Sequence, residues 1–178
     1  LAQVYNQNQP LAGQRIVVTR ARTQAGTLSA KLRGLGADVI ELPVIEFVPL
    51  DFQAPDWYSY QWAIFTSVNG VEHFFARATA GPGPRLCAIG AATAEALRAH
   101  GLEPDVIPEE YVAESLVAAL SDQPLQGARV LLPRALTGRD VIPDELRARG
   151  AQVDVLPVYQ NVVPADLPAQ VQAVFSAI

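Results

Sequence analysis

The chain has 178 residues, of which 50% are hydrophobic and 17% are charged, and its formal net charge is −5 at pH 7. This composition is typical of a folded globular protein and excludes a disordered one, while the negative charge argues against a general nucleic-acid binder. No apolar run reaches the roughly 18 residues of a membrane-spanning helix, and the polar N-terminus lacks a signal-peptide pattern. A single cysteine, Cys87, cannot form an internal disulfide. These features predict a cytoplasmic protein with no membrane partner and with Cys87 as a small core residue.

The first predicted unit is a β-α-β segment over residues 15–42. RIVVTR is an apolar strand, a helix follows from Thr23, Gly36 ends that helix, and ADVIEL is the second strand. The apolar positions of the helix are Leu28, Leu32 and Leu35. A crossover of this kind joins parallel strands.

The middle of the chain alternates strands with helices, which predicts a doubly wound parallel sheet. We expect Asn69 to cap one helix and Thr93 to open another. We expect Pro143 to lie early in a third helix, where proline is tolerated. The predicted strands are 62–66, 86–89, 105–107, 129–132 and 152–156, which would form a complete five-stranded domain.

The sequence contains an internal repeat, with one copy at 13–46 and the other at 127–160. The two copies align without a gap and agree at 13 of 34 positions. Such self-similarity indicates a duplicated α/β half. Among the matched pairs are Arg20 with Arg134 and Gly36 with Gly150, and the copies differ at Ile45 and Tyr159.

Proline-bounded segments follow both copies, and they divide the chain into domains. Domain 1 is predicted over 13–43 and 164–178, domain 2 over 53–156, and the crossings between them over 44–52 and 157–163. We expect the crossings to pair as a two-stranded antiparallel hinge, with domain 1 interrupted by domain 2. Because two parallel strands cannot bury both faces of a sheet, domain 1 is expected to be truncated here and completed by chain beyond residue 178.

Ligands of open α/β sheets bind at the carboxyl ends of the strands, and the residues expected there are mostly hydroxyls, small residues and arginines. No histidine or cysteine lies at a strand end, so this set is poor in groups for acid–base or nucleophilic catalysis. We expect no metal, because no cluster has metal-ligand spacing, and no cofactor, because GAATA is not the GxGxxG of a nucleotide-binding loop. His73 and His100 are expected on the surface. The predicted substrate-binding residues are Thr19, Arg20, Thr66, Ser67, Asn69, Gly90, Thr93 and Arg134.

Each of these predictions has a structural alternative. Asn69 and Thr93 would be explained by helix capping alone. Arg20 and Arg134, which end the first strand of each copy, could instead pair with a neighbouring carbonyl or acid. Tyr159, in the return crossing, could pack on the hinge or direct its hydroxyl into the cleft as a hydrogen-bond donor.

The order and spacing of these segments resemble the uroporphyrinogen-III synthase family over residues 13 to about 175. The motifs that carry the resemblance are VTR, LGADVIELP, FTSVNGVEHF, IGAATAEALRAHGL, IPEEYVAESLVAAL, VLLPRA and GAQVDVLPVYQ. Members of the family run about 80 residues further than this chain.

The resemblance implies two α/β domains joined by a two-stranded ladder. It also implies a cyclizing lyase of haem, sirohaem and cobalamin biosynthesis, which converts hydroxymethylbilane to uroporphyrinogen III with loss of water and inversion of ring D, without cofactor or metal. Tyr159 then becomes the candidate catalytic residue, assisting departure of the hydroxyl group. The implied partners are the tetrapyrrole substrate and a transient handover from hydroxymethylbilane synthase; a monomer is expected. The alternative function is a non-catalytic two-lobed ligand-binding or sensor module on the same fold.

Overall fold

The protein is described by a computed structural model over residues 9–108, 110 and 113–176. Its chain separates into two compact units, Leu1–Phe47 with Asn161–Ile178 and Val48–Gln160. The smaller unit is therefore built from both ends of the chain, and the larger unit from one continuous segment.

The smaller unit contains the predicted β-α-β segment. Strands β1 (Arg15–Val18) and β2 (Asp38–Glu41) are parallel neighbours, and α1 (Arg22–Gly34) connects them. The register pairs the first residue of β1 with the first of β2 and the last with the last. Helix α6 (Leu167–Ser176) follows the return of the chain to this unit.

The buried face of α1 differs from the leucine pattern. Ala25 and Ser29 are buried, whereas Leu28 and Leu35 have exposed fractions of 37% and 42%. The buried positions of this helix therefore carry small side chains, and these two leucines are exposed. Sequence periodicity located the helix correctly but not the face that packs on the sheet.

The larger unit, with the strands that enter and leave it, forms a five-stranded sheet in the order β3-β7-β6-β4-β5 among the described residues. Strand β4 pairs in parallel with β5 and β6, and β6 pairs in parallel with β7, which confirms the parallel α/β fold class. The elements are β3 (Glu46–Pro49), η1 (Trp57–Ser59), β4 (Trp62–Phe65), α2 (Val68–Phe75), β5 (Arg85–Ala88), α3 (Ala91–Ala99), α4 (Ala113–Ala119), β6 (Arg129–Ala135), α5 (Val141–Ala148) and β7 (Gln152–Val162).

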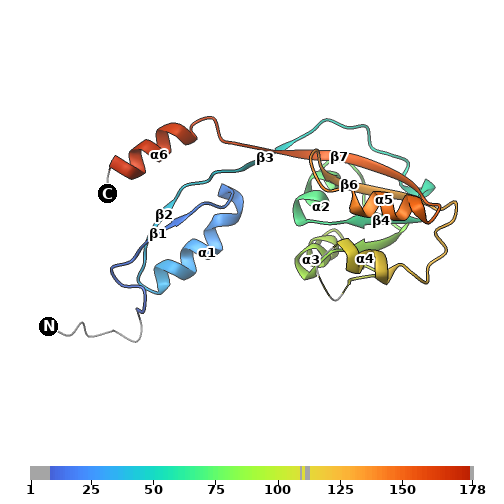
Figure 1. The fold of residues 1–178 in the computed structure, drawn as a ribbon, viewed down its shortest axis with the longest axis horizontal. Helices are drawn as coiled ribbons and strands as arrows, with labels where there is room; N and C mark the ends of the chain where they lie inside the picture. Colours follow the sequence, from blue (N-terminus) through green and yellow to red (C-terminus); the bar gives the residue numbers. More distant parts are fainter. Residues whose placement is uncertain (1–8, 109, 111–112, 177–178) are drawn as a thin grey trace. The chain divides into compact units, whose positions relative to one another are not determined.

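The two proline-bounded segments contribute neighbouring strands. Strand β3 lies beside β7, and the chain runs in opposite directions along them (Figure 1). The backbone N–H of Leu50 extends this contact by donating to the carbonyl of Val158 at 3.0 Å.

The predicted strand at 105–107 is wrong. Only an isolated parallel bridge between Cys87 and Val106 forms there, and the fifth strand of the sheet is β3 instead. Pro104 and Pro108 flank this segment and have no N–H to donate to a neighbouring strand. The three residues between the prolines are too few to extend the pairing.

The repeat in the sequence is also a repeat in the structure. Gly36 and Gly150 end their helices with φ of +93° and +88°, a conformation that glycine adopts without strain. Arg33 donates to the carbonyl of Val39 at 3.3 Å, and Arg147 donates to that of Val153 at 2.9 Å. The matched residues therefore encode the same helix end and the same side-chain contact in both copies.

The core of the larger unit is centred on β4, whose four residues are all buried. One cluster of buried residues packs β4, β5, β6 and β7 against α4 and α5, and it includes Leu116, Leu132 and Leu146. This core fixes the carboxyl ends of the strands, and with them the site described below.

Replacing Leu146 with alanine should destabilise the larger unit. The side chain of Leu146 is fully buried, and truncation of such a leucine removes apolar burial and leaves a cavity, at a cost of about 2 to 5 kcal/mol. The chain's two tryptophans, Trp57 and Trp62, are both buried in this unit, so tryptophan fluorescence during urea unfolding reports on it. The control Leu136→Ala, at a side chain 49% exposed, should cost less than about 1 kcal/mol. Equal losses in the two variants would contradict the assigned core.

Candidate functional site

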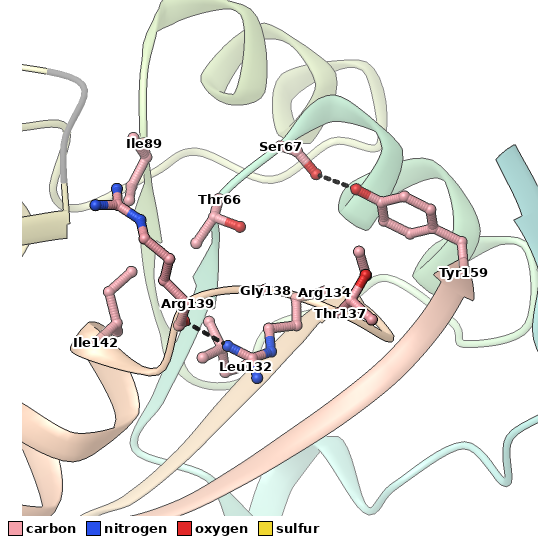
Figure 2. Close-up of a pocket in the computed structure, with 11 residues that line it drawn as sticks. Thr66, Ser67, Ile89, Leu132, Arg134, Thr137, Gly138, Arg139, Ile142 and Tyr159 are labelled. Carbon is pink, nitrogen blue, oxygen red and sulfur yellow. Dashed lines mark hydrogen bonds between the residues drawn. The ribbon is translucent and has the colours of Figure 1, made fainter. Parts of the chain in front are cut away.

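A cavity of about 260 Å³ lies in the larger unit at the carboxyl ends of β4 and β6 (Figure 2). Its walls come from the segments that follow β4 and β5, from β6, from the loop between β6 and α5, from the first turn of α5, and from β7. The lining residues are Thr66, Ser67, Ile89, Leu132, Arg134, Ala135, Thr137, Gly138, Arg139, Ile142 and Tyr159.

The cavity gathers some of the residues predicted from the sequence but not others. Thr66, Ser67, Arg134 and Tyr159 line it together. Three further candidates of the same unit are absent from its wall, namely Asn69, Gly90 and Thr93. The remaining two candidates, Thr19 and Arg20, are exposed residues of the smaller unit.

Ser67, and not Asn69, is the N-cap of α2. The backbone of Ser67 is extended, and its hydroxyl oxygen accepts a hydrogen bond from the N–H of Gly70 at 3.0 Å. Asn69 lies one residue inside the helix, so the predicted cap is two residues too late. Gly70 permits a close approach between helix and strand, because a Cβ there would be 3.2 Å from the carbonyl oxygen of Pro133.

Thr93 is likewise not a cap. Helix α3 begins at Ala91, Thr93 is buried within it, and its N-cap is Gly90 with φ of +89°. Neither Gly90 nor Asp140, the N-cap of α5, caps its helix with a side-chain hydrogen bond. The first amides of both helices therefore lack side-chain caps, and such amides attract anions.

Arg134 makes the contacts named in its structural alternative, which was pairing with a neighbouring carbonyl or acid. Its guanidinium group donates to the carbonyl of Arg139 at 2.7 Å and to the carboxylate of Asp140 at 2.6 Å. The side chain is 14% exposed, and within the described residues its buried Nε has no hydrogen-bond partner. Arg134 thus ties the end of β6 to the loop that precedes α5.

Tyr159 reaches the cavity from β7. Its side chain is 6% exposed, and its hydroxyl lies 3.3 Å from that of Ser67 (Figure 2). A register shift between Arg134 and Ala135 places Tyr159 opposite Ala135. Such irregularities redirect side chains near functional sites. The hydroxyl of Tyr159 is therefore held against the capped start of α2.

His73 is a contact of Tyr159 that the sequence analysis assigned to the solvated surface. The two rings stack with centroids 5.2 Å apart and an interplanar angle of 21°. Burial lowers the pKa of His73, and the nearby charge of Glu72 opposes this in part. His100 is also half-buried, with its ring 5.0 Å from that of Phe75. Local patterns could not show these contacts, because stacking on Tyr159 joins residues far apart in the chain.

The chemistry available at the cavity is hydrogen bonding and positive charge. Cys87 is buried in β5, and burial raises the pKa of its thiol to about 12, so it remains a thiol at neutral pH. Within residues 9–108, 110 and 113–176, no group of three His, Cys, Asp or Glu side chains could hold a metal ion. Hydroxyls, uncapped amides and arginines are suited to hold anions and to donate to an oxygen atom.

The sequence analysis missed Arg139, which lines the cavity from the β6–α5 loop. The available signal was its position five residues after Arg134 in the segment that joins a strand end to a helix start. The helices of the described part of the chain are also too short or too polar for any of them to span a bilayer.

Comparison with known proteins identifies related sequences. The family model described as uroporphyrinogen-III synthase HemD matches residues 26–177. A uroporphyrinogen-III synthase of Synechococcus elongatus is 37% identical over 173 residues, which cover 90% of this chain and 65% of that protein. A porphyrin biosynthesis protein HemD of Ruminiclostridium josui is 32% identical over 85% of this chain and 33% of its own length. The chain thus spans about two thirds of the first relative and one third of the second.

Solved structures share the fold. A mutant uroporphyrinogen III synthase of Thermus thermophilus matches with a TM-score of 0.61 at 19% identity, over 93% of this chain and 68% of that one. The enzyme of Helicobacter pylori matches with a TM-score of 0.55 at 20% identity, over 76% of this chain and 61% of its own. At these identities the likeness shows the fold alone.

The titration of His73 should follow its burial. A ring that loses hydration favours its neutral form, so its pKa in the folded protein should be below the ordinary 6.5. The unfolded chain then binds this proton first as the pH falls, and stability present above pH 6.5 declines as the pH falls toward the folded-state pKa. His73→Asn should reduce the loss of stability between pH 7 and pH 5, whatever its effect at pH 7.

Proton NMR can measure this titration, because the chain has only two histidines and His73→Asn assigns their ring signals. A midpoint for His73 at or above that of a free histidine would contradict its placement against Tyr159.

Proposed function

Because this chain belongs to the uroporphyrinogen-III synthase family, we propose that the full-length protein cyclises hydroxymethylbilane to uroporphyrinogen III. The reaction releases water and inverts ring D through a spiro intermediate, which makes the protein a cyclizing carbon–oxygen lyase of tetrapyrrole biosynthesis. We place it in the cytoplasm as a monomer.

The observation that supports this function is the composition of the cavity at the strand ends. Its polar side chains are those of two threonines, one serine, one tyrosine and two arginines, and two helices begin beside it without side-chain caps. A substrate with eight carboxylates needs such cationic and N–H donors. The conversion needs a folded substrate and stabilised charge more than a strong base.

Tyr159 is the residue best placed to assist departure of the substrate hydroxyl. When that carbon–oxygen bond breaks, both electrons go to the oxygen, and the oxygen must receive a proton to leave as water. A phenol hydroxyl within hydrogen-bond reach stabilises the departing oxygen. Ser67, 3.3 Å away, keeps the phenol oriented. We propose Thr66 as a substrate contact in the same cavity, and Thr19 and Arg20 as contacts from the smaller unit. The predicted contact at Arg134 is revised below, because its guanidinium group is already bound to the carbonyl of Arg139 and to Asp140.

The deciding experiment is an assay of the full-length protein with enzymatically generated hydroxymethylbilane. Chromatography of the oxidised products separates the III isomer from the I isomer that forms spontaneously. The proposal expects the III isomer. Folded protein that yields only the I isomer would refute it and favour the sensor module.

Replacing Tyr159 with phenylalanine should lower turnover without unfolding the protein. Loss of one hydrogen bond to a developing charge should reduce kcat roughly 10-fold, while the ring and its stacking on His73 remain. The matched control is Tyr60→Phe, which removes another buried tyrosine hydroxyl, one that donates to Asp154 at 2.9 Å outside the cavity. An unchanged kcat in Tyr159→Phe, or an equal loss in Tyr60→Phe, would show that the Tyr159 hydroxyl has no chemical role.

A further inference from the structure

The two arginines that line the cavity, Arg134 and Arg139, differ in burial and in hydrogen bonding. The guanidinium group of Arg134 is mostly buried and bound to the backbone of Arg139 and to Asp140. Arg139 is exposed, and among the described residues no hydrogen bond or ion pair holds its guanidinium group. Figure 2 shows its side chain extending from the loop toward Ile89, away from the fork of Arg134.

The contacts of Arg134 also explain why Arg139 is available. The carboxylate nearest to Arg139 in sequence is Asp140, and Arg134 binds it at 2.6 Å. Asp140 is therefore engaged by the buried arginine and does not neutralise the exposed one. Meanwhile the bond to the carbonyl of Arg139, at 2.7 Å, fixes the backbone from which the exposed side chain extends.

Arg139 is better suited than Arg134 to bind a carboxylate that enters the cavity. A planar guanidinium fork binds a carboxylate with two parallel hydrogen bonds when its donors are not already used. Arg134 has already used one donor on each terminal nitrogen, its Nε is buried, and its side chain is only 14% exposed, so it offers an incoming anion no free fork. The first amides of α5 begin two residues after Arg139, at Val141, and have no side-chain cap from Asp140, so they add to the positive potential next to Arg139.

We propose that Arg139 is the side chain of this cavity that binds a carboxylate of the substrate, and that Arg134 is a positioning residue acting through it. This inference rests on the proposed function for the identity of the substrate. It deepens that function by assigning the charged contact to a residue that the sequence pattern did not indicate.

The test compares Arg139→Gln with Arg139→Lys in the full-length protein. Removing the charge should raise KM roughly 10-fold with kcat changed less than about threefold, the size expected for one charged hydrogen-bonded contact. Lysine retains the charge but not the fork, so it should restore part of the lost affinity. The increase of KM with salt concentration should be weaker in Arg139→Gln than in the wild type, because one ionic contact is absent.

The matched control is Arg147→Gln. Arg147 lies in the last turn of the same helix, is exposed, and is not part of the cavity wall. This variant removes the same charge and also the contact of Arg147 with the carbonyl of Val153, so urea unfolding is used first to show that it is folded. It should then leave KM and its salt dependence unchanged. Equal changes in the two variants would overturn the assignment to Arg139, as would an unchanged KM in a folded Arg139→Gln protein.

A double-mutant cycle tests the role of Arg134. If Arg134 acts through Arg139, then Arg134→Lys should raise KM in the wild-type background but not further in Arg139→Gln. Independent, additive increases would show that Arg134 itself binds substrate and would overturn the division of roles.

A binding measurement separates this inference from the proposed function. Uroporphyrin III, a stable porphyrin with eight carboxylates, is used as the probe in equilibrium dialysis against the wild type and Arg139→Gln. Weaker binding by the variant supports the carboxylate site even if the wild type produces no III isomer. Equal binding refutes the site even if the wild type is an active synthase.

Discussion

The parallel pairing of β4 with β5 and β6 is the constraint on which the cavity depends. In a parallel sheet each connection returns the chain to the end of the sheet where the previous strand began. The carboxyl ends of all the strands therefore lie together at the opposite end of the sheet. The residues that follow β4 and β5 and those that end β6 are consequently neighbours, although up to about 70 residues separate them in sequence. Helices that begin at the carboxyl ends of the strands bring their N-terminal amides to the same place. The site is a consequence of topology first and of side-chain chemistry second.

The common position of the strand ends does not by itself explain where Tyr159 lies. This residue comes from β7, a longer strand than its neighbours, after the register shift beside Arg134. Its hydroxyl reaches Ser67, which also caps α2. The same serine therefore stabilises the helix start and orients the phenol. A substitution at Ser67 would change local stability and site geometry together. Tyr159→Phe therefore tests the role of the phenol hydroxyl in turnover more directly.

The two arginines of the cavity have different roles: Arg134 holds the structure together, and Arg139 is the residue that we infer binds substrate. Arg134 uses its fork to join the end of β6, the following loop and the N-cap of α5. This leaves Asp140 compensated and Arg139 exposed on a fixed backbone. The repeat pairs Arg134 with Arg20, yet the ligand contact that we infer falls on a residue outside the matched positions, where the two copies have different sequences.

Local sequence alone determined the β-α-β units, the glycine helix ends and the parallel fold class, because hydrophobic periodicity and positive-φ glycines act over a few residues. It also placed Thr66, Ser67 and Arg134 at strand ends. Tertiary structure decided which of the predicted residues meet. The cap at Ser67 in place of Asn69, the stacking of His73 on Tyr159 and the engagement of Asp140 by Arg134 depend on helix start, strand register and rotamer. Those are set by packing between segments distant in the chain, and no local pattern in one sequence contains them.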